Sequence, residues 1–214
     1  MFDLIVLTFH SYYYDYDDTI MVLVGEEEQR FTVHKDVICA KSKFFRAACS
    51  DRWQEDQEKL VRLPEARSTR AFQIYTNWAY TSEIRADTTA NETQKFHDLV
   101  ELYLLGDLLD DIKLRNRTLR LLNTHIQVGE IFISAVMCQI IWENTPPHSL
   151  LRNWAVDVVI STRSVSYYER NRASWPADLT FQIAVKLLRR QGDVCDYAGL
   201  GKRVEEYMEA DNDA

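Results

Sequence analysis

The stretch from Thr19 to Cys49 constrains the fold of this chain most, because it passes from a strand pattern to a helical pattern without a linker. Residues 20–24 form an unbroken apolar run, IMVLV, which predicts a strand buried on both faces. Residues 31–34 alternate apolar with polar side chains, which predicts a second strand paired with the first as a hairpin. From Lys35 the spacing becomes helical and predicts two short helices, the second capped by Ser42.

Beyond Cys49 the sequence contains two more strand patterns and several segments with the periodicity of an amphipathic helix. The strands are predicted over residues 59–63 and near Ile84. The residues predicted to start or cap three of the helices are Ser68 or Thr69, Asp110 or Asp111, and Asp178. The predicted apolar sides are Phe96, Leu99, Val100 and Tyr103 in one helix and Phe181, Ala184, Val185 and Leu188 in the last. Strands clustered early and helices throughout predict an α+β fold.

Four phrases of the sequence resemble the BTB/POZ family. The first runs DTIMVLV from Asp18 and FTVHKDVICAKSKFF from Phe31, and is similar to the buried strand, F-x-V-H-K and L-x-A-x-S-x-x-F that open such a domain. The others are W-x-E with V-x-L-P within residues 53–64, F-x-x-Y-x-x-W-x-Y-T-x-x-I from Phe72, and L-Y-x-x-G-D-x-L from Leu102, which resembles fungal members. The resemblance implies a small sheet with a cluster of helices, and a function in protein–protein interaction.

The helical pattern continues into residues that resemble the C-terminal extension of fungal BTB proteins, with WENTP from Trp142 followed by Leu-Arg at 151–152 and Val-Asp at 156–157. The sequence therefore predicts four parts: an N-terminal segment (1–16), a BTB/POZ domain (17–124), an all-α C-terminal extension (125–191) and an acidic tail without fixed structure (192–214). The first part is either an extra strand or a partly ordered tail.

Charge and composition exclude several classes of protein. The formal net charge is −8 and no window clusters Lys and Arg with aromatic residues, so no direct nucleic-acid partner is predicted. No apolar run is long enough for a membrane span, and no basic region marks a signal peptide. The four cysteines lie far apart and three fall in apolar helical patterns, which predicts reduced thiols and a cytoplasmic or nuclear protein.

No catalytic residue, metal site or cofactor is predicted. The five histidines show no H-x-x-x-H spacing and the cysteines no C-x-x-C spacing. The alternative hypothesis from another class is a small cysteine-dependent hydrolase or redox protein that uses Cys49 or Cys138, with His34 as the base for Cys49. Because Cys49 lies on the apolar side of a predicted helix, a buried structural thiol is the preferred interpretation.

The resemblance also implies where partners bind. Asp18 and Lys35 match positions that form a charged pocket at the dimer interface of related transcription-factor domains, so a homodimer is expected. In cullin-binding members the scaffold docks around the fourth strand, which places Tyr80 and Glu83 on the partner-binding surface. The expected function is self-association and recruitment of protein partners, including a role as substrate adaptor of a cullin-type ubiquitin ligase. The alternative is that Tyr80 belongs to the core and Glu83 is merely solvated.

Overall fold

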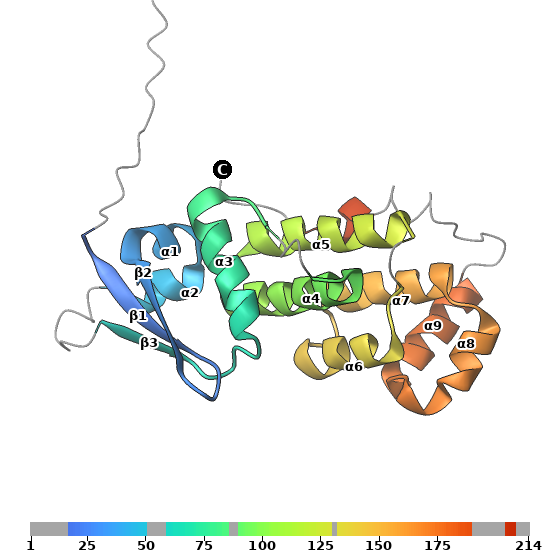
Figure 1. Cartoon of the computed structure of the whole chain (residues 1–214). Coiled ribbons are helices and arrows are strands. Elements are labelled where there is room, and N and C mark those ends of the chain that lie inside the picture. The colour runs from blue at the N-terminus through green and yellow to red at the C-terminus, as the bar shows by residue number, and fades with distance from the viewer. Residues whose placement is uncertain (1–16, 51–58, 86–89, 130–131, 190–203, 209–214) are drawn as a thin grey trace, which may run out of the picture.

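The computed structural model of the protein describes residues 17–50, 59–85, 90–129, 132–189 and 204–208. A three-stranded sheet in the order β2-β1-β3 lies at one end of the molecule (Figure 1). β1 (Thr19–Val24) pairs antiparallel with β2 (Gln29–His34), with Val22 opposite Phe31, and parallel with β3 (Leu60–Leu63). The predicted hairpin and the predicted third strand are therefore confirmed.

The helices begin beside the sheet and continue to the opposite end of the molecule (Figure 1). They are α1 (Lys35–Lys41), α2 (Lys43–Ala48), α3 (Thr69–Thr81), α4 (Glu92–Leu108), α5 (Ile112–Gln127), α6 (Ala135–Asn144), α7 (Leu150–Thr162), α8 (Val165–Arg170) and α9 (Ala177–Arg189), with 3-10 turns at Arg172–Ser174 and Val204–Tyr207. Ser42, Ser68 and Asp111 each accept a hydrogen bond from the backbone N–H three residues later. Three predicted helix starts are thereby confirmed, because these side chains satisfy N–H groups that the helix itself leaves unpaired.

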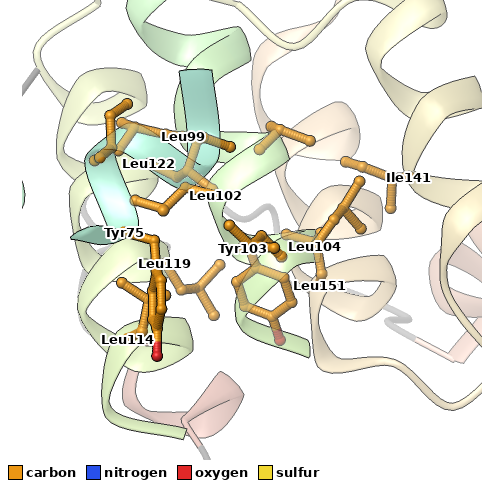
Figure 2. Packing of buried hydrophobic residues seen from close by; sticks show 14 of the residues in the cluster. Tyr75, Leu99, Leu102, Tyr103, Leu104, Leu114, Leu119, Leu122, Ile141 and Leu151 are labelled. Atoms are coloured by element: carbon orange, nitrogen blue, oxygen red, sulfur yellow. The ribbon is translucent and has the colours of Figure 1, made fainter. Parts of the chain in front are cut away.

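α4 is the central helix of the fold. All of its residues from Asp98 to Gly106 are buried, so the helix is buried on every side and not only along the predicted stripe. Figure 2 shows Leu99 and Leu102 of α4 on the side of α5, whereas Leu104 lies on the side of Ile141 and Leu151 from α6 and α7. α4 is therefore shared between the sheet end and the helical end of the molecule.

Two details of the sheet differ from the sequence prediction. Residues 82–85 form no strand, so the strand predicted near Ile84 is wrong. α3 ends at Ser82 in the left-handed conformation (φ 57°), and the N–H of Glu83 bonds to Thr81 Oγ1 at 3.1 Å, so a local turn occupies this backbone. Met21 is 38% exposed, so β1 is not buried on both faces. Ile20, Val22 and Val24 of β1 face the helices, whereas Leu23 lies on the same face as Met21.

The buried face of α9 also differs from the prediction. Leu179 is fully buried, whereas Phe181 and Leu188 are 67% and 76% exposed, so the predicted apolar side faces solvent. The helix sequence carries a second apolar side, and Lys186 on that side bonds to Asp157 of α7 at 2.6 Å. Contact with α7 therefore decides which side of α9 is buried.

Asp178 was predicted to cap α9 but does not, since it lies inside the first turn of that helix. Its carboxylate accepts a hydrogen bond from Trp142 Nε1 at 2.9 Å and lies 3.5 Å from the guanidinium of Arg152. Asp178 thus joins α9 to α6 and α7, and a tertiary contact replaces the local role that the sequence suggested.

One hydrophobic core joins both ends of the described structure. Trp154 of α7 is fully buried; its Nε1 donates to Asn123 Oδ1 of α5 at 3.2 Å, and its ring centroid lies 6.5 Å from that of Phe96 of α4. The boundary predicted between residues 124 and 125 falls within α5. The predictions for residues 1–16 lie outside the described residues.

A short turn near residue 207 is ordered, although the sequence predicts an acidic tail without fixed structure there. Tyr207 is 5% exposed, and its hydroxyl donates to the carboxylate of Asp157 in α7. The turn Val204–Tyr207 contacts both α5 and α7. An aromatic residue within an acidic segment therefore contributes to the core of the helical end.

Candidate interaction surface

Asp18, immediately before β1, forms a charged cluster with two lysines. Its carbonyl oxygen accepts a hydrogen bond from the backbone N–H of Lys35 at 2.9 Å, and its carboxylate lies 3.7 Å from Lys35 Nζ. Lys59 Nζ is closer, at 2.5 Å from Asp18 Oδ1. The hydrogen bond from Lys59 is the main cause that holds the pKa of Asp18 below its usual value, and Lys35 adds to it. The structure thus brings the predicted pair together and adds Lys59.

Lys59 was not predicted to lie beside Asp18, because this contact depends on the pairing of β1 with β3, which no sequence pattern indicates. β1 and β3 are parallel, so the residues that precede them lie at the same end of the sheet. Lys59 precedes β3 as Asp18 precedes β1, and the N–H of Met21 bonds to the carbonyl of Lys59 at 2.8 Å. A prediction that paired these two strands in parallel would have placed the lysine beside the aspartate.

Tyr80, near the end of α3, is exposed but held in place. Its side chain is 43% exposed, so it does not belong to the core. Its hydroxyl oxygen accepts a hydrogen bond from the backbone N–H of His34 at 3.1 Å and lies 2.6 Å from His34 Nδ1. The two rings meet edge to face, with centroids 5.7 Å apart. Two independent contacts therefore fix the orientation of an aromatic ring at the surface.

The end of α3 is also tied to α1. Lys41 Nζ donates to Ser82 Oγ at 2.7 Å and lies 5.3 Å from the centroid of the Trp78 ring. Glu83 follows directly; its side chain is 63% exposed and bonds to Arg85 at 2.8 Å. Glu83 is therefore exposed beside the end of α3, close in sequence to Tyr80.

The structure places the predicted pair of Asp18 with Lys35 and the unpredicted pair of His34 with Tyr80 on either side of one peptide. His34 holds Tyr80, and the next residue, Lys35, holds Asp18, so both pairs meet where β2 becomes α1. We call the surface formed by Asp18, His34, Lys35, Lys59 and Tyr80 the corner surface. Figure 1 shows the elements that build it, with α1 between the sheet and α3. No sequence pattern indicates that the two pairs are neighbours, because His34 and Tyr80 are 46 residues apart.

An open hollow of about 550 Å³ adjoins the corner surface on the outer face of the sheet. All three strands line it, and Lys59 stands at the border between the hollow and the corner surface. The other side chains at the hollow include Met21, Leu23, Arg30, Thr32 and Arg62. The outer face therefore combines apolar floor residues with basic side chains.

Among the described residues no metal-binding arrangement is present, because no group of three or more His, Cys, Asp or Glu side chains is placed to hold a metal ion. His34 bonds to Tyr80, so the hypothetical pair of Cys49 with His34 receives no support. No helix in the described ranges is both long and apolar enough to cross a membrane.

The fold combines a small sheet, helices on one of its faces, and an exposed, ordered aromatic side chain at the corner surface. Comparison with known families identifies it: residues 15–115 match the BTB/POZ domain, and this part of the chain is a BTB/POZ domain. The resemblance to the BTB/POZ family is thereby confirmed for these residues, and BTB/POZ domains are protein-interaction domains. No curated protein matches the sequence significantly. The match ends in the first turn of α5, so α6 to α9 lie outside it.

Proposed function

We propose that this chain is an adaptor that self-associates through its BTB/POZ domain and recruits protein partners at the corner surface. The observation that carries the proposal is Tyr80, whose ring is 43% exposed while its hydroxyl is held by His34. Exposed aromatic residues often dominate interface energies, and a side chain that is already ordered loses little entropy on binding. A reducing compartment, cytosol or nucleus, belongs to the proposal and is supported by the free thiols of Cys39, Cys49 and Cys138.

Self-association as a homodimer is the first part of the proposal. Asp18 links two lysines at a partly exposed site, and a specific dimer would bury about 1,600 Å² in total. Light scattering coupled to gel filtration at micromolar concentration should give twice the mass of one chain. Asp18→Lys would place three cations together and should weaken the dimer, whereas Glu26→Lys in the exposed hairpin turn should not. A wild-type monomer would contradict this part.

The second part is recruitment of a cullin-type scaffold, with Tyr80 as the apolar anchor and Glu83 as the charge that sets orientation. Co-precipitation should recover the cullin with wild type but not with Tyr80→Ala or Glu83→Lys. The matched control is Glu169→Lys, an equal charge change at an exposed position of α8. If wild type recovers no cullin, the adaptor role in a ubiquitin ligase is wrong, while self-association remains testable on its own.

A further inference from the structure

Two cysteines meet where α1 and α2 converge, outside the corner surface. Cys39 lies in α1 and Cys49 follows the last residue of α2. Cys39 Sγ donates to the carbonyl oxygen of Phe45 at 3.4 Å, and the backbone N–H of Cys49 donates to the same oxygen at 2.9 Å. Both cysteines are thus held at one carbonyl group by the fold of the two helices.

The turn between these helices is itself well anchored. Ser42 Oγ donates to the carbonyl of Leu109 at 2.6 Å, and a guanidinium nitrogen of Arg46 donates to the carbonyl of Cys39 at 3.0 Å. The backbone therefore fixes where the two cysteine residues lie relative to each other. Cys49 is 8% exposed, whereas Cys39 is half-buried, so a small reagent reaches the pair from the Cys39 side.

The surroundings of the pair make the two thiols unequal. The neighbouring Cys39 side chain lowers the pKa of Cys49, burial opposes this, and the ammonium of Lys35 assists it. The neighbouring Cys49 side chain raises the pKa of Cys39, and burial and Asp36 act in the same direction. Asp18 opposes ionisation of Cys49. These directions favour Cys49 as the nucleophile of the pair.

We propose that Cys39 and Cys49 form a reactive dithiol, a modification site at which a hydroperoxide converts the pair to an intrachain disulfide. The Cys49 sulfur attacks the peroxide, its S–O bond forms as the O–O bond breaks, and one water leaves. The Cys39 sulfur then attacks Cys49 Sγ, the S–S bond forms, and the S–O bond breaks to release a second water. In total, two thiols and one hydrogen peroxide give one disulfide and two waters.

Cys138 provides the internal comparison. It is fully buried in α6, and burial raises its pKa to about 12. The environment of Cys138 thus disfavours the thiolate that reacts with peroxide. If peroxide oxidised every cysteine of the chain equally, Cys138 would be modified as fast as the other thiols. The proposed site instead predicts that the free thiols of Cys39 and Cys49 are lost first.

The experiment uses the full chain with Cys195, which lies outside the described residues, replaced by Ser. Limiting hydrogen peroxide is added to native and to guanidinium-unfolded protein, free thiols are then alkylated, and peptides are mapped by mass spectrometry. We expect a Cys39–Cys49 link that forms about tenfold faster or more in the native chain, with Cys138 alkylated. Cys138→Ser should form the link equally well, and Cys39→Ser should not form it.

A second probe needs no oxidation and no variant. Phenylarsine oxide, a trivalent arsenical, binds two neighbouring thiols together, so it should protect Cys39 and Cys49 from alkylation in the native protein. Protection of both, reversed by a competing small dithiol, supports the site. The proposal is overturned if the link forms no faster in the native than in the unfolded chain, if Cys138 is oxidised first, or if the arsenical protects neither thiol.

Discussion

Asp111 performs two tasks with a single carboxylate. One oxygen accepts the N–H of Leu114 and caps α5, and the other accepts Trp78 Nε1 from α3, both at 2.9 Å. The side chain is nearly fully buried, and burial is the main cause that raises its pKa. Position 111 thus needs two hydrogen-bond acceptors more than it needs a negative charge.

The variant Asp111→Ala should therefore be less stable than Asp111→Asn. Alanine removes the helix cap, worth about 1 kcal/mol, and leaves the buried Trp78 N–H unpaired, at about 1–3 kcal/mol. Asparagine retains one acceptor oxygen but turns its amide N–H2 toward the other donor, so we expect it to lose about 1–3 kcal/mol, which is less than alanine loses. Urea unfolding followed by tryptophan fluorescence measures both, and equal losses for the two variants would contradict this account.

Asp18 predicts a pH dependence of stability. Its pKa in the folded protein is lowered, so the carboxylate stabilises the fold above the usual carboxyl pKa. That contribution is lost as the pH falls through the lowered folded-state value, below about pH 4. Because Asp18 is partly exposed, the contribution should be about 1 kcal/mol or less. The difference in unfolding free energy between wild type and Asp18→Asn should be constant from neutral pH to about pH 5 and should shrink below about pH 4. An unchanged difference at low pH would show that the ion pairs contribute nothing.

At the scale of elements, the starts of the helices could be predicted from local sequence, whereas the buried side of a helix depended on long-range contacts. Ser42 and Ser68 were recognisable as caps because each bonds to a backbone group three residues away. The buried side of α9 could not be predicted, because α9 carries two apolar sides and the contact of Lys186 with Asp157, 29 residues earlier, selects between them. Lys59 was missed for the same reason, since a parallel strand pairing brought it to Asp18.

Leucines on opposite sides of α9 test that assignment. Leu179→Ala removes a fully buried side chain and should destabilise the protein by about 2–5 kcal/mol. Leu188→Ala removes a side chain that is 76% exposed and should change stability by about 0.5 kcal/mol or less. Thermal unfolding of the pair provides the measurement. A larger loss of stability for Leu188→Ala than for Leu179→Ala would show that the side of α9 predicted from the sequence is the buried one.

At the scale of the whole molecule, the BTB/POZ domain and the C-terminal helices depend on one another. Trp154 packs near Phe96 and bonds to Asn123, and α4 is buried from both directions. A chain truncated after Thr124 should therefore aggregate or lose much of its stability, because each exposed core side chain forfeits about 1.5–3 kcal/mol. Differential scanning calorimetry and solubility of the 1–124 fragment are the measurements. A fragment as heat-resistant as the full chain would show that the helical extension is a separate module.

The turn at Tyr207 also sets an order of events during synthesis. β1 to β3 need only residues 19–63, so the sheet can pair early as the chain emerges from the ribosome. The contact of Tyr207 with Asp157 joins residues 50 positions apart. The last helices therefore cannot reach their final packing until residue 207 has left the ribosome, and until then the nascent chain exposes an incomplete apolar surface. Factors that hold nascent chains would therefore still find apolar surface at the helical end of this protein after the sheet has paired.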